Sequence, residues 1–133
     1  MSPVRLLLAD DVPAMRSLVR YAIEESGAEI DVVGEAGDGM EAILMAQELR
    51  PDVILLDLAM PQMDGLEVLV SLREVAPDTR AVIFSGFASA RMLPQAAELG
   101  AVAYVEKRQP LDDVLAAVLG AGERTRCHHD PAL

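Results

Sequence analysis

Val53-Ile54-Leu55-Leu56-Asp57 is the stretch that decides the fold, because four consecutive apolar residues end directly on a carboxylate. A strand that is apolar on both of its sides is buried on both faces, which is typical of a parallel sheet covered by helices. Four further short segments are predicted strands: Val4–Ala9, Asp31–Ala36, Ala81–Ser85 and Val102–Glu106. The first prediction is therefore a layered α/β protein.

Longer segments between the strands carry apolar residues at three- and four-residue spacing, the period of an amphipathic helix. The predicted helices are Pro13–Ser26, Gly39–Leu49, Leu66–Val75, a segment that ends at Leu99, and Leu111–Leu119. Right-handed crossovers between parallel strands place such helices on both faces of the sheet. This predicts a flavodoxin-like, doubly wound (βα)5 fold with a five-stranded parallel sheet, in the order 2-1-3-4-5 when the first strand is central.

Helix ends carry recognisable signals in this chain. Asp38 is placed to cap the second helix, and Gly27 and Gly100 to end the first and the fourth. Pro94 falls inside the fourth helical segment. Because a proline in mid-helix costs about 3 kcal/mol, we expect a short helix that starts near Pro94 after a long loop over 86–93. A kinked, longer helix is the alternative.

The helical pattern fails from Gly120 onward, which predicts one domain over residues 1–120 and a flexible C-terminal tail over 121–133. The group Cys127-His128-His129-Asp130 has side chains of the kind that bind soft metals. We interpret it as part of the tail, because a specific metal site needs a folded scaffold.

Composition narrows the class of protein. The chain has 133 residues, of which 52% are hydrophobic, and a net charge of −11. One domain of this size can bury a full core, and an acidic chain is a poor partner for nucleic acid or an anionic membrane. A single cysteine, Cys127, suits a reducing compartment. The apolar run Val4–Ala9 is too short for a signal peptide, so we expect a cytoplasmic protein.

Polar residues follow the predicted strands at their carboxyl ends: Asp10 and Asp11, Asp57, Ser85, and Lys107, which is the only lysine. Ligands of open parallel sheets bind at this edge. Carboxylates about 5 Å apart repel by roughly 3 kcal/mol per pair at an effective dielectric constant of about 20. Such a cluster needs a proton or a cation, and oxygen ligands without nearby histidine or cysteine favour Mg²⁺. The open positions on that ion suit phosphate oxygens, with a hydroxyl and an ammonium to bind the others.

In order along residues 4–120, these motifs resemble the receiver domains of bacterial two-component response regulators. The motifs are Leu8-Ala9-Asp10-Asp11, Asp57-Leu58-Ala59-Met60-Pro61-Gln62-Met63-Asp64-Gly65, Ile83-Phe84-Ser85-Gly86 and Gly100-Ala101-Val102-Ala103-Tyr104-Val105-Glu106-Lys107. The resemblance implies a phosphoaspartate switch in which Asp57 accepts a phosphoryl group from a phosphohistidine. It implies Mg²⁺ bound by Asp11, Asp57 and the backbone carbonyl of Ala59, with Asp10 acting mostly through water.

The resemblance also assigns the switch. Ser85 is expected to move toward the phosphoryl group and Tyr104 to turn into the space left behind, while Lys107 pairs with the phosphoryl group, or with Asp57 before transfer. The family usually has proline after this lysine, often with a cis bond, but Arg108 stands here. Because a cis bond without proline costs about 3–4 kcal/mol, the Lys107–Arg108 peptide is either trans or strained, and the position of the ammonium is open.

Several residues have plainer interpretations. Asp64 and Gly65 are expected to form a turn and a helix start, and Gly37-Asp38-Gly39 a turn with a cap. We expect Met60 and Met63 to pack in a loop and not to act as ligands.

The resulting hypothesis is a stand-alone regulatory domain and not a metabolic enzyme, with self-catalysed phosphoryl transfer and autodephosphorylation. Its expected partners are a sensor histidine kinase or phosphotransfer protein and a downstream effector protein, without direct nucleic-acid or membrane contact. A phosphorelay intermediate and a fragment of a longer DNA-binding regulator stay open. So does the oligomeric state, since the fourth helix, fifth strand and fifth helix commonly form dimers in this family.

Two rival classes differ in a testable way. An aspartyl-phosphate phosphatase of the haloacid dehalogenase type would want an aspartate where Ala59 stands, and it would hydrolyse small phosphate esters. A flavin- or nucleotide-binding module would want a loop rich in Gly, Ser and Thr after the first strand, where this chain has two acids.

Overall fold

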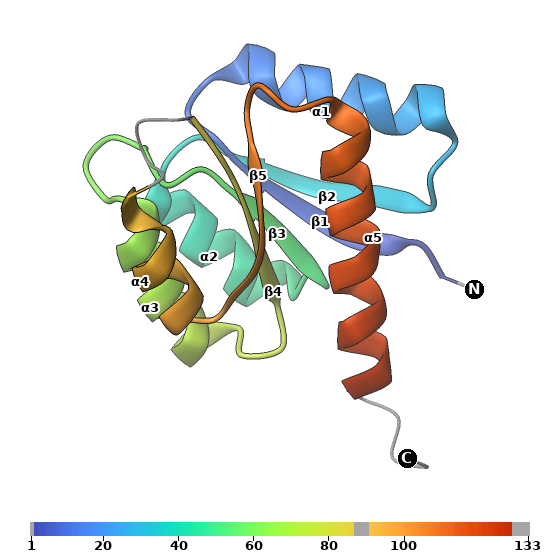
Figure 1. Ribbon diagram of the computed structural model, residues 1–133. Coiled ribbons are helices and arrows are strands. Elements are labelled where there is room, and N and C mark those ends of the chain that lie inside the picture. Colours follow the sequence, from blue (N-terminus) through green and yellow to red (C-terminus); the bar gives the residue numbers. More distant parts are fainter. Residues whose placement is uncertain (1, 87–90, 129–133) are drawn as a thin grey trace.

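The computed structural model describes residues 2–86 and 91–128 as a single sheet with helices on both faces (Figure 1). Strands and helices alternate along the chain: β1 Val4–Ala9, α1 Pro13–Ser26, β2 Ile30–Ala36, α2 Gly39–Leu49, β3 Val53–Leu56, α3 Gly65–Val75, β4 Arg80–Ser85, α4 Leu93–Glu98, β5 Ala101–Glu106 and α5 Leu111–His128. All strand pairs are parallel, and the strand order is β2-β1-β3-β4-β5. The predicted flavodoxin-like (βα)5 fold is confirmed.

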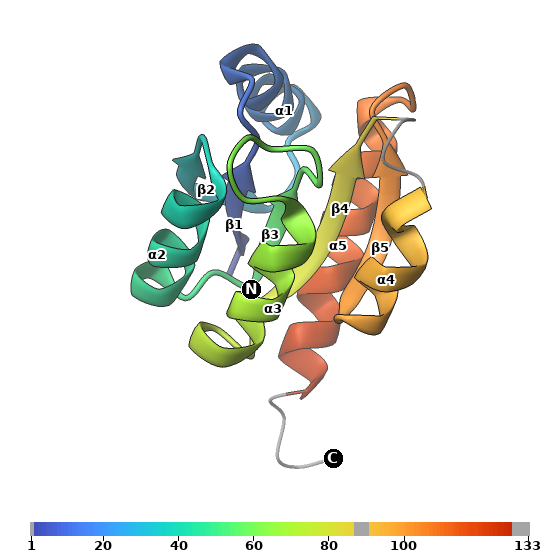
Figure 2. The same ribbon diagram turned by 90° about the vertical axis from the view of Figure 1, so that its left-hand side faces the viewer.

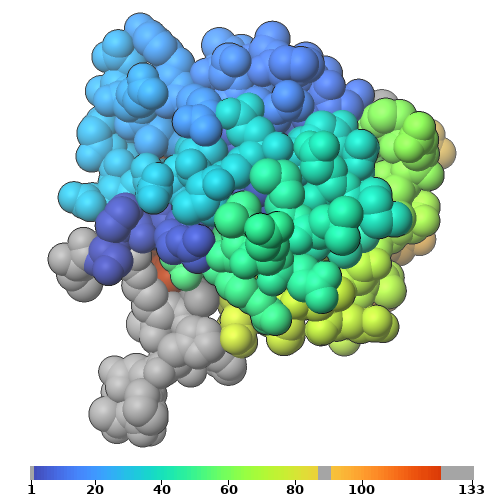
Figure 3. Space-filling model, turned by 180° about the vertical axis from the view of Figure 1, so that it is seen from behind, coloured from blue at the N-terminus to red at the C-terminus, as the bar shows by residue number. Residues whose placement is uncertain are grey.

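Alternation of side chains along the central strands builds two separate cores. Ile54 and Leu56 of β3 face α2, α3 and α4, while Val53 and Leu55 face α1 and α5. Figure 2 shows α2, α3 and α4 on the near side of the sheet and α5 behind it. Because β3 is buried on both faces, its apolar run is continuous, as the sequence indicated. The edge strand β2 lies at the surface between α1 and α2 (Figure 3).

The predicted caps are present. Asp38 accepts a hydrogen bond from the Glu41 amide at 2.8 Å, and Gly27 ends α1 with φ of 70°. Gly100, with φ of 106°, follows α4. Asp64 caps α3 by accepting from the Glu67 amide, as its turn interpretation predicted.

Helix α4 is short and has Pro94 in its first turn, as predicted. The expected loop over 86–93 falls partly on residues 87–90, which lie outside the described residues.

The predicted end of the last helix at Leu119 is wrong, because α5 continues to His128. Ala121 is buried, and a Cβ at Gly122 would lie 2.5 Å from a methyl group of Val4. Glycine costs a helix about 1 kcal/mol relative to alanine. Here it allows the helix to approach β1 closely, and this packing outweighs the local cost. Residues 129–133 of the predicted tail lie outside the described residues, as do the side chains of the Cys127-His128-His129-Asp130 group.

Within residues 2–86 and 91–128, no helix combines the length and apolar character needed to cross a membrane.

Candidate functional site

The carboxyl ends of β1, β3, β4 and β5 meet at one edge of the sheet, and strand pairing continues just beyond them. The Asp57 amide donates to the Ala9 carbonyl at 3.0 Å, and the Lys107 amide donates to the Ser85 carbonyl at 2.9 Å. The backbone at the strand ends is therefore fixed by the same ladder that forms the sheet. The side chains that follow converge without needing a special loop.

Three carboxylates form a compact group at this edge. One oxygen each from Asp10, Asp11 and Asp57 lies within 4.8 Å of the others. Asp10 and Asp57 are buried, with 6% and 4% exposure, whereas Asp11 is exposed. At such distances each pair repels by roughly 3 kcal/mol at an effective dielectric constant of about 20. The group therefore needs a positive charge close by.

Lys107 supplies such a charge. Its Nζ lies 2.8 Å from Oδ2 of Asp10 and 2.9 Å from Oδ2 of Asp57, and 5.8 Å from the ring centre of Phe84. Burial lowers the pKa of Lys107, but the hydrogen bonds with Asp10 and Asp57 outweigh burial and raise the pKa above its ordinary value. The ammonium is thus firmly charged. No cis peptide bond occurs in the described residues, so the Lys107–Arg108 bond is trans.

Ser85 and Ala59 bind the other oxygen of Asp57. The fully buried Ser85 hydroxyl donates to Oδ1 at 2.8 Å, and the Ala59 amide donates to the same atom at 2.9 Å. Both oxygens of Asp57 thus have defined donors, which fixes the orientation of the carboxylate. The predicted role of the Ala59 carbonyl as a metal ligand remains a prediction.

The donor set fits a hard divalent ion. The three clustered carboxylates are oxygen donors, and Asp11 is the exposed member through which an ion and its waters can enter. Mg²⁺ prefers one or two carboxylates and keeps several waters. The residues that could hold it are Asp10, Asp11 and Asp57. Direct binding by Asp11 and Asp57, with Asp10 acting through water, remains a prediction.

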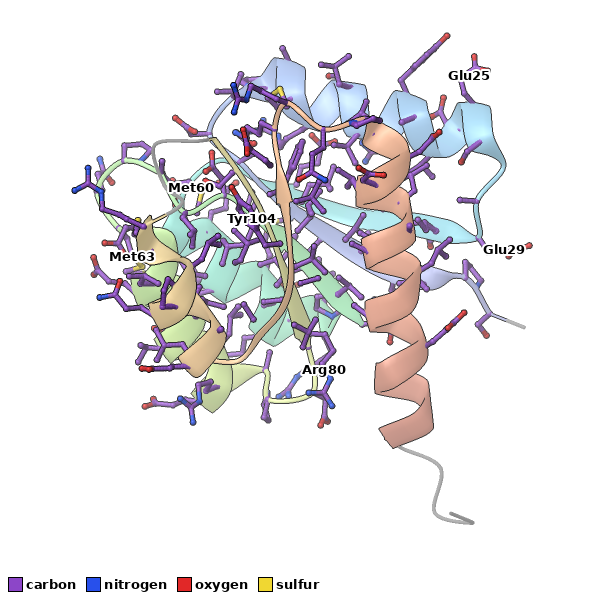
Figure 4. All side chains as sticks on the ribbon, viewed as in Figure 1. Glu25, Glu29, Met60, Met63, Arg80 and Tyr104 are labelled. Atoms are coloured by element: carbon purple, nitrogen blue, oxygen red, sulfur yellow. The ribbon has the colours of Figure 1, made fainter. Side chains whose placement is uncertain are left out.

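Tyr104 lies on β5 next to α4 (Figure 4). With Leu93, Ala96, Ala97 and others it lines a hollow of about 220 Å³ on that side of the molecule. Its hydroxyl is buried and has no hydrogen-bond partner among the described residues. Burial raises the pKa of Tyr104; the nearby Glu106 adds to this shift, and Arg108 opposes it.

Met60 and Met63 belong to the β3–α3 loop and pack against the core next to α2 and α3, which confirms that they are packing residues (Figure 4).

Arg16 is a residue of this region that the sequence analysis did not single out. Its guanidinium donates to the backbone carbonyl of Asp10 and to the carboxylate of Glu35 at 3.0 Å. Arg20, one turn later, pairs with the other oxygen of Glu35. The hydrogen bond from Arg20 holds the pKa of Glu35 below its ordinary value; burial opposes this shift and the hydrogen bond from Arg16 adds to it. Two arginines one helical turn apart were the visible signal, but no local pattern pairs them with a strand residue.

A comparison with protein families matches the response regulator receiver domain over residues 6–119. The chain therefore belongs to the receiver domains of two-component response regulators, a regulatory family.

Individual relatives agree. The chain is 33% identical over 115 residues to the chemotaxis protein CheY of Listeria monocytogenes, covering 86% of this chain and 95% of that protein. It is 42% identical over 123 residues to the nitrate/nitrite response regulator NarL of Escherichia coli, covering 91% of this chain and 56% of that protein. The chain spans about half the length of several curated transcriptional regulators that it matches, among them one of Pseudomonas aeruginosa, of which 54% is covered.

Solved structures give the same picture. The receiver domain of a putative response regulator NarL from Mycobacterium tuberculosis superposes with a TM-score of 0.83 at 34% identity, over 92% of this chain and 98% of that chain. The receiver domain of AraT from Geobacillus stearothermophilus has a TM-score of 0.85 at 29% identity, over 96% of this chain and 98% of that chain.

Proposed function

We propose that this chain is a phosphoaspartate signalling switch that accepts a phosphoryl group on Asp57 from a histidine kinase phosphohistidine, with Mg²⁺ as cofactor. The observation that carries the proposal is the convergence of Asp10, Asp11 and Asp57 with Lys107 at the strand ends. An oxygen of Asp57 attacks phosphorus, the P–N bond breaks, and imidazole leaves; water later hydrolyses the acyl phosphate.

The chain's own residues prepare this step. The Ser85 hydroxyl and the Ala59 amide hold Oδ1 of Asp57, and Lys107 holds Oδ2. Lys107 has three N–H donors, so it can pass from the carboxylate to a phosphoryl oxygen as the charge moves. Mg²⁺, when bound by Asp11, Asp57 and the Ala59 carbonyl, offsets negative charge on the carboxylates and the phosphoryl group.

The contacts of Ser85 and Tyr104 also explain how phosphorylation of Asp57 would be signalled to another protein. A phosphoryl group offers new acceptor oxygens, and the Ser85 hydroxyl can leave Oδ1 to donate to one of them. Tyr104 then turns into the space beside Ser85. Its hydroxyl has no hydrogen-bond partner in the described part of the chain, so this turn breaks no such bond there. The new positions of Ser85 and Tyr104 shift α4 and β5 from one conformational state to another, and a downstream effector protein binds the two states differently. We place the chain in the cytoplasm, since a single cysteine is typical of proteins of a reducing compartment.

One alternative has an observation in its favour. The transcriptional regulators among the relatives are about twice as long as the matched region. The same switch could therefore be the receiver part of a longer DNA-binding regulator. Phosphoryl transfer to Asp57 is common to both interpretations.

The test is incubation with acetyl phosphate and Mg²⁺, followed by intact mass. The unsubstituted chain should gain one labile phosphoryl group and Asp57→Asn none. Turnover of small phosphate esters with no phosphorylated protein would instead support a phosphatase.

A further inference from the structure

Arg16 joins three elements of the structure at the candidate site. It lies in the first turn of α1, its side chain is only 17% exposed, and its guanidinium donates both to the Asp10 carbonyl, at 2.5 Å, and to Glu35 on β2, at 3.0 Å. A guanidinium presents its N–H donors in a rigid planar fork, so it can hold two acceptors in fixed directions at once. Arg16 therefore links β2 and α1 to the exact point where β1 ends.

The Asp10 carbonyl is the first one beyond the β1 ladder. The Asp10 amide still donates to Ala36 of β2, and the Ala9 carbonyl accepts from Asp57 of β3. With the next peptide the chain leaves the sheet. The carbonyl of that peptide, between Asp10 and Asp11, accepts from Arg16. Arg16 thus fixes the orientation of a peptide that the sheet no longer controls.

That peptide determines where Asp11 points. The Asp11 carboxylate is exposed and, among the described residues, makes no hydrogen bond or ion pair, yet one of its oxygens lies within 4.8 Å of the other two carboxylates. Asp10, by contrast, is held by the Val12 amide and by Lys107. The position of Asp11 in the cluster therefore depends on its backbone.

We propose that Arg16 is a positioning residue that aims Asp11 at the metal ion by holding the Asp10–Asp11 peptide. The inference rests on the proposed function, since it concerns the same Mg²⁺ site. Glu35 keeps the guanidinium in place and offsets its charge, and Arg20 pairs with Glu35 from the next turn.

Charge and positioning predict opposite effects, which makes the inference testable. Removal of a cation near three carboxylates should by itself strengthen binding of a divalent cation. Loss of a positioning contact should weaken it, and removal of partners that orient metal ligands typically costs about 10–100-fold in affinity. Arg16→Met should therefore weaken Mg²⁺ binding about tenfold, despite the charge that it removes.

Arg20→Met is the matched control, because Arg20 pairs with the same Glu35, whereas it is Arg16 that donates to the Asp10 carbonyl. Calorimetric Mg²⁺ titration of the full chain should give an unchanged or tighter dissociation constant for Arg20→Met. Phosphorylation of Arg16→Met should need more Mg²⁺ but approach the unsubstituted rate at saturation, since Asp57 is intact. Equal Mg²⁺ affinities for the two variants would overturn the inference.

A second pair of variants tests the inference if Arg16→Met fails to fold. If Arg16→Met does not fold, Arg16→Lys and Arg20→Lys replace the two methionine variants, with weaker Mg²⁺ binding expected for Arg16→Lys alone. Failure of the inference is distinct from failure of the proposed function: in the second case the unsubstituted chain itself takes neither Mg²⁺ nor phosphate, which overturns both.

Discussion

The ammonium of Lys107 lies as close to Asp10 as to the proposed phosphoacceptor, with 2.8 Å from Nζ to Oδ2 of Asp10 and 2.9 Å to Oδ2 of Asp57. One cation therefore bridges two carboxylates that belong to the proposed metal site. A divalent ion entering that site has to share these acids with Lys107.

Lys107→Met should therefore bind Mg²⁺ about tenfold more tightly, because a cation near two carboxylates of the site is removed. The free energy of a tenfold change is a modest part of the roughly 4 kcal/mol of interaction between two unit charges 4 Å apart at an effective dielectric constant of about 20. Calorimetric titration measures the change. Lys107→Arg is the matched variant. It should retain Mg²⁺ binding but impair switching, since a planar guanidinium cannot replace a point charge on one oxygen. Unchanged Mg²⁺ affinity in Lys107→Met would argue against the bridging role.

Ser85→Ala should lower the free energy of unfolding by about 1–2 kcal/mol, because a fully buried hydrogen bond to the Asp57 carboxylate is lost. Urea unfolding measures this value. Phosphorylation should survive while binding of the effector after phosphorylation weakens. Ser85→Thr keeps the hydroxyl and should retain both the stability and the effector binding of the unsubstituted chain. A threonine variant as defective as the alanine variant would contradict the proposed role of the hydroxyl.

Tyr104→Phe should be as stable as the unsubstituted chain or more stable, by up to about 1 kcal/mol, since the buried hydroxyl makes no hydrogen bond with a described residue. Tyr104→Ala should lose about 3 kcal/mol, because the ring packs against the core beside α4. Thermal unfolding of both variants is the measurement. A clear loss of stability in Tyr104→Phe would reveal a hydroxyl partner and contradict the proposed freedom of the ring to turn.

Glu35 should make stability depend on pH in the acid range. Its pKa is lowered in the folded chain, chiefly by Arg20. A carboxyl group with a lowered folded pKa stabilises the fold above its unfolded pKa, about 4.3, and this contribution is lost as the pH falls through the folded pKa. Urea unfolding should show Glu35→Gln less stable than the unsubstituted chain near neutral pH, with the gap closing below about pH 4. A gap of constant size across that range would contradict the ion pair.

Gly122→Ala and Gly120→Ala should change stability in opposite directions. A Cβ at Gly122 would lie 2.5 Å from Val4, so the first variant should lose about 1–3 kcal/mol through overpacking. A Cβ at Gly120 meets no atom of the described residues within 4 Å, so the second should gain about 0.5–1 kcal/mol of helix propensity. Chemical unfolding of the pair tests the continuation of α5. If both alanines stabilise, the contact of α5 with β1 is wrong.

Sequence reasoning was strongest where a signal is local. Continuous apolar strands, the Asp38 cap and Pro94 each act within a few residues, so the strands, the start of α2 and the short α4 could be predicted. The strand order came from the rules of the doubly wound fold, with the first strand at the centre. Five polar side chains at strand ends converge because parallel strands end at one edge. Their chemical roles remain predictions.

Contacts between segments that are distant in the chain could not be predicted from local sequence signals. The end of α5 depends on Gly122 fitting against Val4, and the glycines by themselves indicated a break. Arg16 and Glu35 are 19 residues apart and meet only because β1 and β2 are neighbours under α1. The bridge from Lys107 to Asp10 likewise needed the positions of β1 and β5 relative to β3.

Reductive trapping of the phosphorylated chain tests the central claim most directly. Borohydride converts an aspartyl phosphate to homoserine, and peptide mass mapping then locates the converted residue. After incubation with acetyl phosphate, we expect homoserine at position 57 when Mg²⁺ is present and none when a chelator has removed it. Conversion at any other aspartate, or conversion at position 57 that is indifferent to Mg²⁺, would contradict the account.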